Sequence, residues 1–286
     1  MIVTVAGFLP FESGKTRLAA RLVRVLRERG VDVLPYKPIG AHNLWEQHFS
    51  VEYSLEHRVL VGGDAIRLAR AAGVKPEEVQ PVDLLLAPPD VARFLQRPRD
   101  YLNAASNTFT QAVLVRIDTC RGWRGHLLVE DRLEALPPSL RRVAEELSER
   151  LEPSPVRIDQ ARFADMLASG QLLLAADSCA ATAASKTRLL ILESFNDVLI
   201  PIPKAIDSRL FIVAAPGRAV VYSGEAVVRA VEVLSGIKPG QVRSHEVLGL
   251  VKPLAVVDVD YAYSDDQLGE DIERLADMVL RLLGEA

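Results

Sequence analysis

The first 36 residues place a strand, a loop, a helix and a second strand in immediate succession, and this order constrains the fold more than any other feature. The β-branched run at residues 2–6 ends at Gly7, and apolar residues recur every three or four positions over 14–29. A second apolar run follows at 31–36. A strand, a crossover helix and another strand in so short a segment form a right-handed βαβ unit, whose sheet is parallel and buried. The sequence therefore predicts an α/β fold.

Apolar runs and amphipathic segments alternate along the rest of the chain, as expected of an α/β protein. The predicted buried strands lie at residues 112–117, 189–192, 210–214, 247–251 and 254–257. The predicted helices lie at residues 62–72, 137–150, 160–168, 223–235 and 265–283. The least regular part of the sequence is 97–185. We therefore predict one domain over 1–286 with an insertion or subdomain at about 97–185.

Composition and charge exclude several classes of protein. The 286 residues are 49% hydrophobic and 25% charged, which is typical of a globular chain. A formal net charge of -4 argues against binding to nucleic acid or to an anionic membrane, since clustered positive charge drives both interactions. No apolar run approaches the roughly 18 residues of a membrane span, and the apolar start is too short for a signal peptide. We expect a cytoplasmic location.

Residues 7–16 connect the first strand to the first helix and read Gly-Phe-Leu-Pro-Phe-Glu-Ser-Gly-Lys-Thr. They resemble a Walker A phosphate loop, in which backbone N–H groups and a helix N-terminus face the phosphates. Lys15 would reach the β- and γ-phosphate oxygens, and Thr16 would offer its hydroxyl to Mg²⁺. The usual glycine five positions before Gly14 is Leu9 here. A surface turn is the alternative, but the position between a strand and a helix favours a nucleotide site.

Four segments together resemble the dethiobiotin synthetase-like P-loop ATPases, a family related to the amide-forming enzymes of cobyric acid synthesis. The phosphate loop at 7–16 corresponds to the family's GTDTxVGKT, and residues 36–39 (YKPI) correspond to its YKPV. Residues 63–68 (GDAIRL) resemble a helix start that contains SDA, and residues 192–197 (LESFND) stand where the family has VEGAGG. The resemblance implies a P-loop NTPase fold, with a mostly parallel sheet flanked by helices, and a homodimer.

The resemblance also implies site residues and a reaction. Loop residues would bind the nucleotide, namely Glu12, Ser13, Gly14, Lys15, Thr16 and Arg17. Thr16, Asp64 and Glu193 would hold one Mg²⁺. Lys15 and Lys37 would be catalytic, with Lys37 holding a carboxylate or carbamate oxygen that ATP phosphorylates before an amine closes an amide or urea. The implied cofactors are ATP and Mg²⁺, and the implied partner is a small-molecule substrate.

Each of these roles has an ordinary structural alternative. Asp64 also suits the cap of the predicted helix at 62–72, because aspartate is a good capping residue. Glu193 suits a solvated carboxylate at a strand end, and Lys37 suits an exposed surface lysine. The chain has no NKxD motif for guanine after its late strands. ATP is therefore preferred to GTP as the nucleotide.

The chain departs from the family pattern in two places. Six residues separate Gly7 from Gly14 where the family has five, and residues 194–196 (SFN) replace the glycines after the family's glutamate. Side chains therefore stand where bare backbone would approach the substrate. The similarity covers roughly 1–95 and 187–260. These departures leave a second function open, a nucleotide-dependent regulatory or binding protein that hydrolyses ATP slowly.

Three histidines lie close together in the sequence, at His42, His48 and His57. The same stretch contains two aromatic residues, Trp45 and Phe49, and it follows the second predicted strand. We expect a substrate-binding loop here rather than a metal site.

Overall fold

The computed structural model describes residues 1–120, 122–235, 240–261, 264 and 267–284. The chain divides into two compact units. The first unit comprises Met1–Pro38, Arg67–Val79 and Ala176–Ala286, and the second comprises Ile39–Ile66 and Gln80–Ala175. Each unit combines helices with a sheet that contains parallel strands, so the predicted α/β class is confirmed. The insertion predicted at about 97–185 overlaps the second unit, while a single domain over 1–286 stays a prediction.

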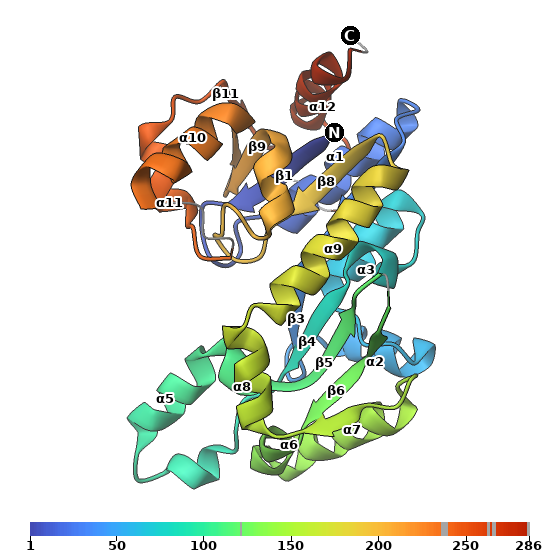
Figure 1. Ribbon diagram of the computed structural model, residues 1–286, viewed down its shortest axis with the longest axis vertical. Coiled ribbons are helices and arrows are strands. Elements are labelled where there is room, and N and C mark those ends of the chain that lie inside the picture. The colour runs from blue at the N-terminus through green and yellow to red at the C-terminus, as the bar shows by residue number, and fades with distance from the viewer. Residues whose placement is uncertain (121, 236–239, 262–263, 265–266, 285–286) are drawn as a thin grey trace. The chain divides into compact units, whose positions relative to one another are not determined.

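The first unit contains a six-stranded sheet in the order β11-β10-β9-β1-β8-β2 (Figure 1). Its strands are β1 (Ile2–Gly7), β2 (Val33–Tyr36), β8 (Leu189–Glu193), β9 (Ser208–Ala215), β10 (Arg218–Ser223) and β11 (Ala255–Asp258). Strand β1 lies between β8 and β9 and pairs with both in parallel, and β8 pairs in parallel with β2. Strands β10 and β11 extend the sheet in antiparallel pairing. The carboxyl ends of four parallel strands therefore meet at one edge.

Helices of the first unit pack on this sheet through apolar stripes. They are α1 (Lys15–Glu28), α4 (Pro76–Val79), α10 (Gly224–Ser235), α11 (Ser244–Val247) and α12 (Glu270–Leu283), with 3₁₀ turns η3 (Pro203–Asp207) and η4 (Leu248–Leu250). Two more helices, α3 (Gly63–Ala72) and α9 (Gln171–Lys186), contain residues of both units. No helix among the described residues has the length and hydrophobicity required to cross a membrane.

A buried ion pair joins α1 to α12 within the first unit. Arg21 is 2% exposed, and its guanidinium donates to the two carboxylate oxygens of Asp271 at 3.1 and 3.2 Å. A third Arg21 bond reaches the Gln267 carbonyl at 2.9 Å. Apolar neighbours Leu22 and Leu275 belong to the same core. An arginine of an amphipathic helix ordinarily faces solvent, but Arg21 is buried because Asp271 compensates its charge.

One predicted strand of the first unit is wrong. Residues 247–251 form the end of α11 and the turn η4, not a strand. The carboxylate of Glu246 accepts a hydrogen bond from the Arg243 N–H at 2.7 Å, which stabilises a helix start at this point. The predicted helix at 265–283 is observed as α12 from Glu270 onward, and its residues 265–266 lie outside the described residues.

The second unit contains a five-stranded sheet in the order β3-β4-β5-β6-β7 (Figure 1). The strands are β3 (Ile39–Asn43), β4 (Val82–Leu86), β5 (Ala112–Asp118), β6 (Arg124–Val129) and β7 (Val156–Ile158). The helices and turns are α2 (His48–His57), η1 (Val91–Phe94), α5 (Pro98–Ser106), η2 (Thr108–Gln111), α6 (Glu130–Ala135), α7 (Pro138–Arg150) and α8 (Gln160–Ala168). The stretch expected to be a substrate-binding loop is thus a strand followed by a helix.

A row of polar side chains is buried in this second sheet. Asp83 on β4 lies opposite Arg116 on β5, which lies opposite His126 on β6, and all three are at most 1% exposed. The Arg116 Nε donates to the Leu60 carbonyl at 2.6 Å, and the Leu60 N–H donates to the Nε2 atom of His126 at 3.3 Å. His42 lies beside the row, with its Nδ1 3.1 Å from Asp83 Oδ2. The row therefore anchors the segment that leads into α3.

His126 makes the free energy of unfolding depend on pH. Burial, helped by the Arg116 charge and opposed by a bond to the Pro153 carbonyl, lowers the pKa of His126 to about 4 from the ordinary 6.5. Between these pH values the unfolded chain binds a proton that the folded chain does not, so stability falls as the pH falls from about 6.5 to about 4. At about 1.4 kcal/mol per pKa unit, the loss from this residue is about 3 kcal/mol.

Denaturant unfolding of the full chain and of a His126→Gln variant, measured from pH 7 to pH 4.5, checks this prediction. The variant should be less stable at pH 7, but its stability should fall less steeply with acidification. The difference between the two slopes reports the effect of His126. Equal slopes would contradict a neutral, buried imidazole.

Candidate functional site

The loop between β1 and α1 ends in a left-handed glycine. Gly14 is the N-cap of α1 with φ 84°, a conformation that disfavours residues with a Cβ atom. The first backbone bond of the helix runs from the Leu18 N–H to the Gly14 carbonyl at 2.9 Å. No side chain caps the start of the helix, and its first turn contains no acidic residue to offset the partial positive charge there. The positive end of the helix dipole therefore faces the loop, as an anion site requires.

Gly7 supplies the close backbone approach that the sequence pattern lacks at Leu9. A Cβ atom on Gly7 would lie 2.6 Å from the Ser13 hydroxyl oxygen and 2.9 Å from the Leu9 carbonyl oxygen. The loop thus folds back over the end of β1, and only glycine leaves room for it. The Lys15 ammonium donates to the Ser13 hydroxyl at 3.3 Å, and both side chains are buried.

A carboxylate at the end of β8 joins the start of α1 to the end of β2. Glu193 is fully buried, and its Oε1 atom accepts a hydrogen bond from the Thr16 hydroxyl at 2.7 Å. The same Oε1 atom accepts from the Lys37 ammonium at 2.9 Å. Parallel pairing places Val5 beside Glu193, so both strands bring their carboxyl ends to the same edge. Three predicted site residues, distant in sequence, therefore meet at one oxygen atom.

This arrangement supplies hard oxygen ligands beside a helix N-terminus. Because the Thr16 hydroxyl donates its proton to Glu193, its oxygen lone pairs stay available to a cation. Mg²⁺ prefers carboxylate and hydroxyl oxygens and is commonly held by one or two protein groups together with phosphate oxygens. The donor set of Thr16 and Glu193 fits such an ion.

The other predicted site residues occupy different surroundings. Glu12 is exposed and has φ 53°, and Arg17 is exposed in the first turn of α1. Asp64 belongs to the second unit, where it is half-buried in the first turn of α3. Its role as a Mg²⁺ ligand stays a prediction. Lys37 is 4% exposed, so it is not the ordinary surface lysine that was the alternative.

The segment after Glu193 was expected to present side chains to the substrate. Ser194 is instead buried, and its hydroxyl donates to the Val198 carbonyl within the same turn. Asn196 has φ 49°, a left-handed conformation that asparagine tolerates better than most residues with a side chain. Asparagine thus takes a backbone conformation that glycine most often supplies.

Asp197 fixes this segment, and it was not predicted as a site residue. Its Oδ1 atom accepts from the Arg243 guanidinium at 2.7 Å, and its carbonyl accepts from the Ser244 N–H at 2.9 Å. Arg243 also pairs with Val198 in an isolated β-bridge. No sequence spacing signals this contact, because the two charged residues lie 46 positions apart.

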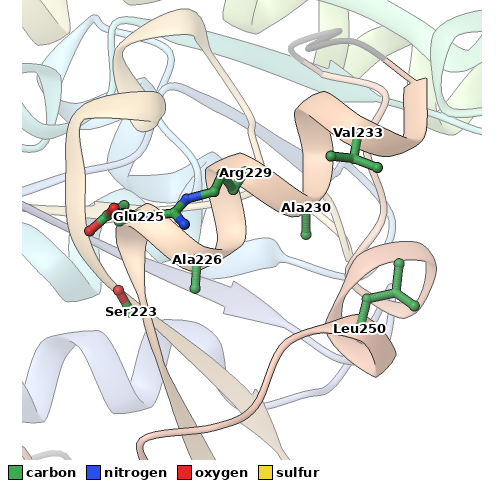
Figure 2. Close-up of a pocket in the computed structure, with 7 residues that line it drawn as sticks. All are labelled: Ser223, Glu225, Ala226, Arg229, Ala230, Val233 and Leu250. Carbon is green, nitrogen blue, oxygen red and sulfur yellow. Dashed lines mark hydrogen bonds and ion pairs between the residues drawn. The ribbon is translucent and has the colours of Figure 1, made fainter.

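The first unit also contains a cavity of about 420 Å³ beside α10 (Figure 2). Its lining residues are Ser223, Glu225, Ala226, Arg229, Ala230, Val233 and Leu250. None of the predicted site residues is among them. Glu225 and Arg229 form an ion pair on α10, so the charged groups of this cavity neutralise each other.

Comparison of the chain with protein-family models, curated proteins and solved structures finds no match.

Proposed function

We propose that the first unit binds Mg·ATP and transfers its terminal phosphoryl group to a carboxylate or carbamate, as a step in forming an amide or urea. The observation that carries the proposal is the single Glu193 oxygen that accepts from both Thr16 and Lys37. A phosphate loop, a metal-binding carboxylate and a buried ammonium are the groups that such a transfer requires. Their meeting at one edge of the sheet supports this combination.

The phosphate chain would lie against the loop and the N-terminus of α1. Because Gly14 is left-handed and has no side chain, phosphate oxygens could approach the backbone there. The Lys15 ammonium would bind phosphate oxygens in place of the Ser13 hydroxyl. Thr16 and Glu193 would hold Mg²⁺. The ion would neutralise negative charge on the phosphate oxygens.

Lys37 would orient the acceptor oxygen. Its ammonium is held in place by Glu193 and by the backbone, since the Lys37 N–H donates to the Val79 carbonyl at 2.9 Å. A buried ammonium attracts an anionic carboxylate or carbamate and keeps its oxygen in one position. Transfer of phosphate to that oxygen gives an acyl phosphate and ADP, and an amine then displaces phosphate from the carbonyl carbon.

A second candidate is the nucleotide-dependent regulatory ATPase. The observation that favours it is that Lys37 already serves as the counterion of a buried carboxylate. In that function, metal binding at Glu193 would alter its ion pair with Lys37 and so affect the end of β2. No acceptor substrate would be needed. A cytoplasmic homodimer acting on a small molecule stays the prediction for the first candidate.

ADP release from Mg·ATP distinguishes the two functions. We expect the purified protein to release ADP faster when bicarbonate and the diamine substrate of dethiobiotin synthetase are present together than when either is absent. Release that ignores both compounds would favour the regulatory function or another acceptor. An absence of ADP release and of nucleotide binding would contradict the proposal as a whole.

A further inference from the structure

A second cavity, of about 310 Å³, lies in the second unit between the start of α2 and the start of α7. Its lining residues are Leu44, Trp45, His48, Val51, Glu52, Ser139, Leu140 and Val143. Leu44, Val51 and Leu140 belong to the hydrophobic core of this unit, and Val143 is half-buried beside them. The cavity therefore has an apolar floor that is continuous with the core. Its volume lies at the lower end of the range for ligand pockets, about 300–1,000 Å³.

Trp45, His48, Glu52 and Ser139 carry the polar groups around this floor, and Glu52 is the one acidic residue of the lining. The His48 Nε2 atom lies 2.8 Å from the Trp45 carbonyl oxygen, which only accepts, so Nε2 is the donor. In the neutral ring, Nδ1 is then an acceptor. Glu52 is exposed and makes no hydrogen bond or ion pair with the described residues. The cavity therefore carries one uncompensated negative charge.

Trp45 adds a second group that attracts cations. Its side chain borders the cavity and is 63% exposed, which leaves much of the indole surface open to a ligand. The face of an indole ring attracts an ammonium ion more strongly than the other aromatic side chains do. The carboxylate and the indole favour a positive charge, and the apolar floor favours a small apolar group. A ligand that suits the cavity would combine the two.

We propose that this cavity binds a small organic ammonium ion. The apolar group of the ligand would cover Leu44, Val51 and Leu140, and its positive nitrogen would lie between Glu52 and Trp45. The first-unit cavity offers no such preference, because Glu225 and Arg229 already neutralise each other there. The inference rests on the second unit alone and does not depend on the proposed nucleotide site.

Tryptophan fluorescence of the full chain tests this inference, with benzylammonium as the probe at pH 7.5. The chain has two tryptophans, so a Trp123→Phe background leaves Trp45 as the only indole. We expect a saturable change in Trp45 emission with benzylammonium and binding about tenfold weaker with benzyl alcohol, which lacks the charge. Calorimetric titration of the unmodified chain gives the same comparison without any substitution. Equal affinity for the alcohol, or no saturable binding in either measurement, would overturn the proposal.

A matched pair of variants on α2 tests the role of the carboxylate. Glu52→Gln should weaken benzylammonium binding about three- to fivefold, as for a solvent-accessible ion pair, and should leave benzyl alcohol binding unchanged. Glu56→Gln removes the same charge from the same helix outside the cavity and should change neither affinity. Equal effects of the two substitutions would mean that only the overall charge acts, and the site would be wrong.

Discussion

Replacing Lys15 with alanine should lower the affinity for Mg·ATP about a hundredfold while leaving the fold intact. The side chain is buried at the start of α1, where its ammonium donates to the Ser13 hydroxyl in the loop at 7–16. A hydrogen bond to a charged group contributes about 1.5–3 kcal/mol, and the loss of one strong bond to phosphate, about 2.7 kcal/mol, accounts for the expected factor. Calorimetric titration with a non-hydrolysable ATP analogue measures it.

An exposed lysine of the same unit provides the control. Lys186 lies at the end of α9, and Lys186→Ala removes an equal charge without touching the loop. Its nucleotide affinity should match that of the unmodified chain. Thermal unfolding of both variants separates lost binding from lost structure. If Lys15→Ala binds the analogue as well as Lys186→Ala does, the phosphate-loop interpretation is wrong.

The parallel part of the first sheet was predictable because its strands are mostly apolar. Strands β1, β8 and β9 are buried on both faces, and so read as short uninterrupted hydrophobic runs. The helix α1 was predictable from its apolar spacing. These are local signals, and each belongs to one continuous segment of sequence.

In the second sheet, only β5 was predicted, from the apolar run at 112–117; its other strands and the turn at 247–251 were not predictable on the same grounds. Strand β3 contains His42, Gly40 and Asn43, and its polar residues resemble those of a loop until β4 pairs with it. A short apolar run such as 247–251 suits a strand or a helix equally well, because periodicity needs a longer segment. Pairing with β4 decided the first outcome, and the hydrogen bond between Arg243 and Glu246 at the start of α11 decided the second.

The site was predictable in part. The loop at 7–16 is a local pattern, whereas the meeting of Thr16, Lys37 and Glu193 depends on parallel pairing between distant strands. Only the resemblance to a known family suggested that meeting in advance. The replacement of a glycine by Leu9 looked like a defect in the pattern, but Gly7 provides the close approach from a different position.

Replacing Glu193 with glutamine should lower Mg²⁺-dependent ATP turnover about a hundredfold, a loss typical of a weakened metal site. Glutamine keeps an oxygen that accepts from Thr16, but the amide lacks the negative charge that binds Mg²⁺. The substitution should also lower the free energy of unfolding by about 3 kcal/mol, because it removes the carboxylate that faces the buried Lys37 ammonium. Turnover at saturating ATP and denaturant unfolding measure the two effects.

A second substitution separates the metal-binding role of Glu193 from its structural role. In the double variant Lys37→Met and Glu193→Gln, the buried ammonium is gone together with the carboxylate, so most of the lost stability should return. Turnover should stay low, because no carboxylate is restored for the metal and the proposed acceptor-binding ammonium is gone as well. If stability and turnover recovered together, neither Glu193 nor Lys37 would act directly in the reaction, and the pair would only support the fold. If Glu193→Gln alone kept its Mg²⁺-dependent turnover, the ion would lie elsewhere, and Thr16 with Glu193 would be only a hydrogen-bonded pair at a strand end.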